Sequence, residues 1–555
     1  MIRRRDFVAG VGAMLAARPL GASPAPLQVA YVHARVWTGR PQAKPATAFG
    51  TIGNRIAAVG DDRAIRALCD KSTRVIDLGG AFAMPGCMDN HTHFLRASFM
   101  LGTPELRTAK TRSEFVERVG RAARGLRPGR WLQGGNWDEQ AWGGELPTRA
   151  WIDGVTGDTP VAIVRLDQHL VLLNTTALKL AGIDRSTPDP PGGLILRDAT
   201  GEPNGLLKDR AGLLVKRVIP PPTDHEVDEA MAAGAAYAVS KGVTQVHVTE
   251  LDWTTHDSLR RLRASNVLPM RFYSFVPLED WPRLAELTRR EGRGDDWVRW
   301  GGLKGLIDGS LGSRTALFRE PYADDSHNHG LYRTPPERLR DAIVAADAAG
   351  LHVTVHAIGD AANEQVLDMF AEAASRNGPR DRRFRIEHAQ HLLAEDIPRF
   401  ARQQVIASMQ PYHAADDGRW AAKPLGQGRL HGAWAVRSLL DAKACVTFGS
   451  DWPVAPLDPV LGIDAAVLRR TIDGATPQGW TPEQRISATE ALTAYTRANA
   501  FAGFQDDRLG AIAPGFLADI TVLDTDLASC DPERIRTARV LRTIVDGVTR
   551  FGETA

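Results

Sequence analysis

The apolar residues near both ends of the chain fall into short runs broken by turn-forming residues. Gly, Asn and Asp separate the runs, a pattern typical of β-strands. We therefore predict one small β-sandwich domain built from both chain ends, residues 27–83 and 505–555. The predicted strands cover residues 29–32, 55–59, 74–78, 518–523 and 540–545.

Between these ends, strand-like apolar runs alternate with helical patterns such as residues 360–375, which indicates a parallel α/β core. We predict that residues 84–504 form a (β/α)₈ TIM barrel. Residues 98–240 separate the first two barrel strands and are expected to form an insertion that covers the mouth as a lid. The eight strands are predicted to end near Asn90, Val248, Val276, Leu306, His356, His388, Gln410 and Ser450.

The first residues have the layout of a twin-arginine signal peptide. Arg3, Arg4 and Arg5 precede Phe7, an apolar run over 8–17 and small residues around 21–23. The apolar run is too short to span a bilayer. We expect residues 1–26 to direct export by the twin-arginine route to the periplasm, the alternative being a basic, disordered N-terminus.

Composition narrows the class of partner. The chain has 68 Lys and Arg against 66 Asp and Glu, and this net charge of +2 lacks the basic excess typical of nucleic-acid binding. We expect a small-molecule substrate, no nucleic acid and no stable membrane anchoring, with a homo-oligomer left open. The cysteines are too scattered for a zinc ribbon or a dense disulfide framework, although one disulfide stays open. They are Cys69, Cys87, Cys445 and Cys530.

Candidate metal ligands follow the predicted strands. His91 and His93 lie two residues apart at a strand end, so both rings can project to the same face and reach one metal. His356, His388 and Asp451 fall at three later strand ends. Because the C-terminal ends of barrel strands converge, these residues are predicted to form one site.

Lys304 lies in an apolar strand, where an ammonium group is expected to need a partner. One interpretation is a snorkelling or salt-bridged lysine. The other is a carbamylated lysine, whose carboxylate-like group would bridge two divalent metals.

These residues, in this order, resemble the amidohydrolase superfamily. The segment Pro85-Gly86-Cys87-Met88-Asp89-Asn90-His91-Thr92-His93, the strand lysine, the later histidines and Gly449-Ser450-Asp451 carry the resemblance. Further segments resemble the YtcJ-like (amidohydrolase 3) branch, which includes N-substituted formamide deformylase. They are Gly134-Gly135-Asn136-Trp137-Asp138, Asp167-Gln168-His169, Asn174, Gly309-Ser310-Leu311-Gly312-Ser313-Arg314 and His356-Ala357-Ile358-Gly359-Asp360.

The resemblance implies a centre of two divalent metals, with zinc expected from histidine and carboxylate ligands. Its ligands would be His91, His93, Lys304, His356, His388 and Asp451. The first two histidines and the aspartate would hold the more buried metal, and the later histidines the other. The lysine would bridge both after carbamylation, which requires carbon dioxide. Gln168 stands where the branch often has Gly before its histidine.

The expected activity is hydrolysis of a non-peptide carbon–nitrogen bond, such as an N-acyl or N-formyl amide, by metal-activated water. Asp451 would be the catalytic acid and base. Alternatives are ester or lactone hydrolysis, deamination, isomerisation, or a non-enzymatic sensor, for which a broken ligand set would be expected. Candidate substrate contacts are Trp137, Asp138, His169, Ser310, Ser313 and His413, whereas His247, His352 and His391 are not expected to be ligands.

Overall fold

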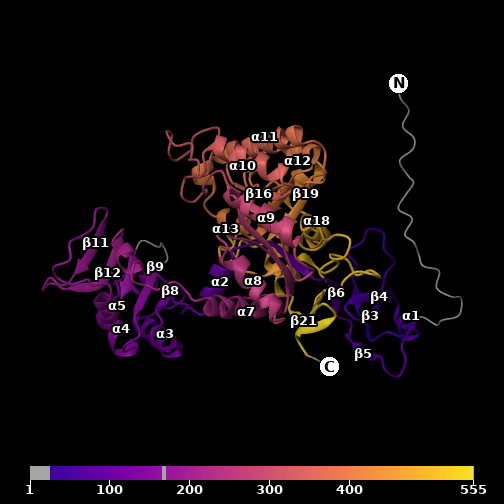
Figure 1. Ribbon diagram of the computed structural model, residues 1–555, viewed down its shortest axis with the longest axis horizontal. Helices are drawn as coiled ribbons and strands as arrows, with labels where there is room; N and C mark the ends of the chain where they lie inside the picture. Colours follow the sequence, from indigo (N-terminus) through magenta and orange to yellow (C-terminus); the bar gives the residue numbers. More distant parts are fainter. Residues whose placement is uncertain (1–24, 166–169, 554–555) are drawn as a thin grey trace.

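The computed structural model describes residues 25–165 and 170–553, and its centre is a ring of eight parallel strands (Figure 1). Each predicted strand end lies within two residues of an observed one, so the predicted barrel is confirmed. A parallel bridge from Thr92 to Trp452 joins the first strand to the segment after the last. The strands are β7 (Cys87–Thr92), β13 (Val243–Thr249), β14 (Arg271–Pro277), β15 (Val298–Leu306), β16 (His352–Ala357), β17 (Arg385–His388), β18 (Ile406–Met409) and β19 (Cys445–Phe448).

Helices surround the ring, and the layer between helices and strands holds most of the apolar core. Leu303, Val355, Leu367 and Phe370 are buried in this layer. The helices include α8 (Thr254–Ala264), α9 (Trp281–Glu291), α10 (Pro336–Ala348), α11 (Asp360–Asn377), α12 (Ile397–Gln403), α13 (Pro411–Asp417), α15 (Val436–Asp441), α16 (Pro459–Leu468), α17 (Ala488–Tyr495) and α18 (Arg497–Ala502). In the described part of the chain, no helix combines the length and apolar character needed to cross a membrane.

The two chain ends meet in a pair of sheets beside the barrel. One sheet has the order β4-β3-β1-β5, and the other, β2-β6-β20-β21-β22, joins N-terminal and C-terminal strands. Tyr31, Phe49, Ile520 and Ile544 share the core between them. The strands are β1 (Val29–Val32), β2 (Arg35–Val36), β3 (Ala48–Ile52), β4 (Arg55–Gly60), β5 (Arg74–Asp77), β6 (Phe82–Pro85), β20 (Ile520–Leu523), β21 (Val540–Val545) and β22 (Val548–Phe551).

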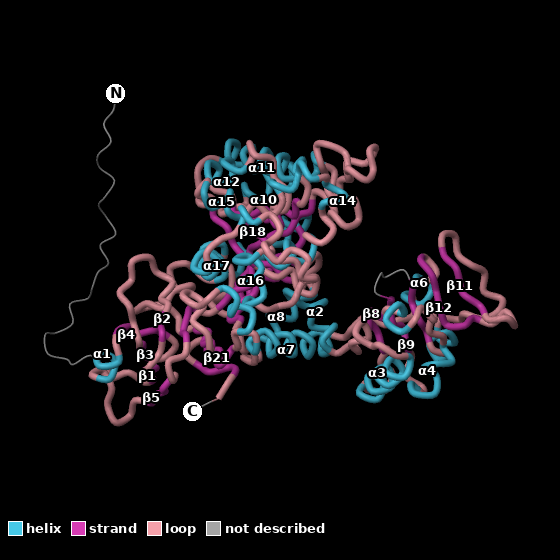
Figure 2. The backbone as a smooth tube through the Cα atoms, turned by 180° about the vertical axis from the view of Figure 1, so that it is seen from behind, coloured by secondary structure: helices cyan, strands magenta, loops and turns pink. Residues whose placement is uncertain are grey.

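The insertion after β7 has a five-stranded sheet and its own apolar cores. It projects from the barrel beyond α2 (Phe94–Leu101) and α7 (Asp224–Ser240) (Figure 2). Its strands are β8 (Leu132–Trp137), β9 (Val161–Arg165), β10 (Leu170–Leu173), β11 (Gly193–Arg197) and β12 (Pro203–Asp209). Its helices are α3 (Arg112–Gly125), α4 (Arg149–Thr156), α5 (Thr175–Leu180) and α6 (Gly212–Lys216).

Helix α7 lies within the range predicted for the insertion, but it packs in the helical layer of the barrel. Its residues Met231 and Ala235 share a core with Phe94 of α2 and Val246 of β13. The insertion is tied to this helix by surface ion pairs, including Arg130 to Glu226 at 2.7 Å. Its role as a lid stays a prediction.

A buried ion-pair network joins the barrel to the composite sheets. The Arg271 guanidinium on β14 is fully buried and donates to Asp519 at 2.7 and 2.9 Å and to Asp546 at 2.7 Å. The two aspartates raise the pKa of the Arg271 guanidinium despite its burial, because they favour its charged form.

We predict that Arg271→Ala lowers the thermal unfolding midpoint and costs about 3–5 kcal/mol, because the buried Asp519 and the partly buried Asp546 lose their counter-charge. Calorimetry or chemical unfolding measures the loss. The matched control is Arg289→Ala, whose side chain is 74% exposed in an ion pair with Glu286 and should change stability little. Equal stability of the two variants would contradict the role given to Arg271.

Candidate metal centre at the barrel mouth

Four of the predicted ligands lie close together at one end of the barrel. They come from β7, β15, β17 and the segment that follows β19. The Nε2 atom of His91 lies 3.4 Å from Lys304 Nζ and 3.5 Å from Asp451 Oδ1. Ligand atoms of His91, His388 and Asp451 all lie within 4.8 Å of one another, and all three residues are buried. Such a group of imidazole and carboxylate ligands can hold a divalent metal.

The structure brings the other two predicted ligands to the same cluster. His93 Nε2 lies 3.3 Å from Asp451 Oδ1. The His356 ring centroid lies 4.6 Å from that of His388. The six residues proposed as ligands therefore gather at one end of the barrel, although they are spread over 361 positions of the sequence.

The orphaned oxygen of Asp451 tests whether this cluster fits a metal. Its Oδ1 atom is buried and accepts no hydrogen bond from any described residue. A buried carboxylate oxygen without a donor is costly, and a cation placed between it and the facing imidazoles would remove that cost. The donor set therefore fits a divalent metal with nitrogen and oxygen ligands.

Three histidines are oriented by hydrogen bonds from their outer ring nitrogens. His91 Nδ1 lies 2.5 Å from Glu387 Oε2, and His388 Nδ1 lies 2.8 Å from Gln410 Oε1. His356 Nε2 lies 2.9 Å from the Gly309 carbonyl oxygen. Each contact leaves the other ring nitrogen for the cluster, as is usual for metal-binding histidines.

Protonation favours the metal-binding forms of these groups. Burial lowers the pKa of His91 to about 4 and that of His356 to about 3, so both rings are neutral at pH 7. Burial also lowers the pKa of Lys304 to about 8, which increases the fraction of neutral amine. A neutral amine is the form that can react with carbon dioxide.

Glu387 is a charged residue at this site that the sequence analysis did not identify. Burial would raise its pKa, but Arg385 and His91 hold that pKa well below its ordinary value. The carboxylate lies 2.8 Å from Arg385 Nη2 and accepts a hydrogen bond from Ser408 at 2.5 Å. The sequence feature that could have indicated Glu387 is an acidic residue directly before His388, in a strand whose residues are all buried.

The predicted substrate contacts occupy different places. His413 on α13 faces the cluster, with Nε2 4.0 Å from Asp451 Oδ2. Ser310 and Ser313 lie in the loop after β15, with their hydroxyl oxygens 2.8 Å apart.

Among the insertion residues predicted as substrate contacts, Trp137 packs inside the insertion. Trp137 is fully buried in the core of the insertion, where its Nε1 donates to the Ile163 carbonyl at 3.3 Å. Asp138 follows it at the end of β8 and is half-buried. His169 lies outside the described residues.

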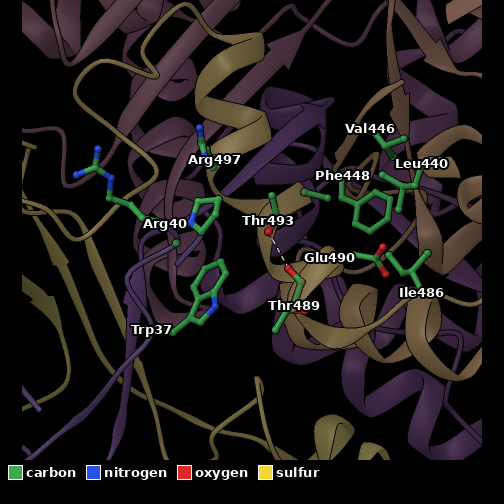
Figure 3. Close-up of a pocket in the computed structure, with 13 residues that line it drawn as sticks. Trp37, Arg40, Leu440, Val446, Phe448, Ile486, Thr489, Glu490, Thr493 and Arg497 are labelled. Carbon is green, nitrogen blue, oxygen red and sulfur yellow. Dashed lines mark hydrogen bonds between the residues drawn. The ribbon is translucent and has the colours of Figure 1, made fainter. Parts of the chain in front are cut away.

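The histidines not expected to be ligands have other partners. His247 Nδ1 lies 2.8 Å from Arg385, and His352 Nδ1 lies 2.9 Å from the Tyr273 hydroxyl. His391 Nε2 lies 3.1 Å from the Gln390 amide. A pocket of about 290 Å³ lies between Trp37 and α17, and no candidate ligand lines it (Figure 3).

The fold and the cluster together define a barrel with a candidate metal centre at its mouth. The family model described as "Amidohydrolase family" matches residues 74–551. The chain therefore belongs to the amidohydrolase family, and the resemblance found in the sequence is confirmed.

Sequence relatives cover most of the chain. Protein LONG AFTER FAR-RED 3 of Arabidopsis thaliana is 40% identical, covering 89% of this chain and 86% of its own. A Bacillus subtilis (strain 168) protein named as an amidohydrolase, YtcJ, is 34% identical over 86% and 90%. The N-substituted formamide deformylase of Arthrobacter pascens is 29% identical over 94% and 98%.

A solved structure supports the same class. The crystal structure of a metal-dependent hydrolase from Pyrococcus furiosus matches with a TM-score of 0.76 and 28% identity, covering 90% of this chain and 100% of that one. The family match and this structural likeness both support assignment of the chain to the metal-dependent hydrolase class.

We predict that Glu387→Gln weakens metal binding about 10- to 100-fold, because His91 loses the carboxylate that fixes its ring. Competition with a chromogenic chelator measures the affinity. Glu395→Gln is the matched control, since Glu395 is 62% exposed on the surface. An affinity for metal equal to that of the control would show that Glu387 does not support the site.

Proposed function

We propose that this protein hydrolyses a carbon–nitrogen bond of a small, non-peptide amide, including N-acyl and N-formyl compounds. The convergence of four histidines, Lys304 and Asp451 at the mouth of an amidohydrolase barrel is the observation that carries the proposal. The deformylase relative, which covers 94% of the chain, supports an amide as the substrate.

The proposed ligands are His91, His93, Lys304, His356, His388 and Asp451. When bound, divalent ions, with zinc expected, supply Lewis acidity and a hydroxide nucleophile near neutral pH. Asp451 would accept the proton of the attacking water and deliver it to the leaving nitrogen. His413, whose Nε2 lies 4.0 Å from Asp451 Oδ2, would contact the bound substrate.

A substrate panel tests the type of bond. Amides, esters and lactones of matched size are assayed with the metal-loaded protein, and amides are expected to give the highest kcat/KM. The proposal would be contradicted if esters or lactones were turned over faster than amides. It would also be contradicted if the protein catalysed deamination or isomerisation without amide hydrolysis.

We also propose export by the twin-arginine route, from the paired arginines and short apolar run within residues 1–26. Residues 1–24 of this segment lie outside the described structure. Cell fractionation tests the proposal, and recovery of the uncleaved chain in the cytoplasm would overturn it.

We predict that Asp451→Asn lowers kcat about 10²- to 10⁴-fold, because it removes the proton acceptor while preserving volume. Steady-state assays at saturating metal, with metal content measured in parallel, separate lost catalysis from lost binding. Near-normal kcat would exclude Asp451 from the chemistry.

We predict about two metal ions per chain after preparation with zinc and bicarbonate, and a loss of both metal and activity in Lys304→Ala. The buried amine lies 3.4 Å from His91, and a carbamate there would supply two anionic oxygens. Elemental analysis and mass spectrometry measure the metal content and the carbon dioxide adduct. An added short carboxylic acid is expected to restore part of the loss, whereas an unmodified lysine in the fully active, metal-loaded enzyme would overturn the assignment.

A further inference from the structure

A large pocket lies between the barrel and the insertion, and residues close in sequence to His93 and Asp451 form part of its wall. Its volume is about 810 Å³, which is within the range of small-molecule sites. Its walls come from α2, from the turn after Asp451 and from strands β8 and β9. Apolar lining residues include Phe99, Met100, Trp131, Leu132, Pro453 and Val454.

Two short chain segments connect the pocket wall to the candidate ligands, because Arg96 follows His93 by three residues and Val454 follows Asp451 by three. Helix α2 begins directly after His93. Because residues three or four apart lie on the same side of a helix, Arg96 and Met100 follow His93 along one face of α2. The His93 amide donates to the Trp452 carbonyl at 2.8 Å, so this helix start lies against the turn that carries Pro453 and Val454. A substrate held at the cluster would reach the pocket by extending along α2.

The pocket exposes apolar side chains to solvent. Val454 is 62% exposed, although it follows the buried Asp451 by only three residues. Phe99 and Met100 are half-buried on α2. Exposed apolar surface next to a polar site is typical of ligand-binding grooves, because a ligand gains free energy by covering it.

The charge at the rim limits the kind of ligand. Within residues 25–165 and 170–553, no carboxylate forms an ion pair with Arg96, whereas Arg130 is paired with Glu226 at 2.7 Å. An unneutralised guanidinium beside the pocket disfavours a cationic ligand and tolerates a neutral or anionic one.

We propose that this pocket binds a large apolar group carried by one side of the scissile amide, and that Arg96 disfavours substrates in which this group is cationic. The inference rests on the proposed amide hydrolysis and specifies its substrate class. Val454, Met100 and Arg96 are then specificity-determining residues, while the metal ligands perform the chemistry.

Two homologous series of neutral amides test the proposal, one lengthened on the acyl side and one on the nitrogen side. In the series that is lengthened on the side entering the pocket, kcat/KM should rise about fourfold with each added methylene until the pocket is filled. Val454→Ser should flatten that rise without changing metal content. The matched control is Val267→Ser, at a valine that is 56% exposed in the loop before β14, which should leave the rise unchanged.

The role of Arg96 is tested with an amide whose added alkyl group ends in an ammonium group. This substitution should lower kcat/KM at least tenfold, and Arg96→Gln should recover much of the loss. An equal penalty in the wild type and the variant would overturn the role of Arg96.

Binding of an uncleavable phenylalkyl alcohol, measured by calorimetry, separates this proposal from the proposed function. If the alcohol binds and Val454→Ser weakens its binding, but no amide is cleaved, the pocket is supported and the proposed function fails. If amides are cleaved with no dependence on chain length, and the alcohol does not bind, the pocket proposal is overturned and the proposed function is retained.

Discussion

The hydrogen-bonded closure of the barrel between β7 and the segment after β19 is the constraint on which the site depends. The Asp451 amide donates to the His91 carbonyl at 2.8 Å, and the Asp89 carboxylate accepts from the Ser450 amide at 3.0 Å. Gly449 permits this approach, because a Cβ there would lie 2.6 Å from Asp89 Oδ1 and 2.7 Å from the backbone nitrogen of His91. Closure therefore aligns the first and last ligands of the chain.

Closure also concentrates buried charge, which the barrel interior must balance. Glu387 meets this requirement by accepting from His91 while it pairs with Arg385 at 2.8 Å. Arg385 in turn contacts His247 and donates to the Asn90 carbonyl, so the network returns to β7. Because buried charges are stable only when paired, the orientation of His91 and the charge balance of the core are set by the same contacts.

The strand ends and the six candidate ligands could be predicted because their signals are local. An apolar run ending in His or Asp identifies a strand end, and barrel topology then brings such ends together. Glu387 could not be recognised in this way, since its partners His91 and Arg385 are set by tertiary packing. Trp137 was misleading for a related reason: an aromatic residue beside a polar motif can fill a core as well as a substrate site, and only the insertion's packing distinguishes these roles. The assignment of α7 failed because a helix in a long insertion carries no local mark of the layer against which it packs.

The candidate ligands and the pocket between the barrel and the insertion depend on different parts of the fold. The candidate ligands lie on or directly after strands whose positions are fixed by neighbouring strands and by a buried ionic network. The adjoining pocket instead has one wall on the barrel and one on the insertion, which packs around its own cores and meets α7 through surface ion pairs. A substitution in β8 or α2 can therefore alter the volume and polarity of the pocket without breaking the closure that aligns His91 with Asp451. This independence would allow one ligand geometry to serve substrates with different substituents.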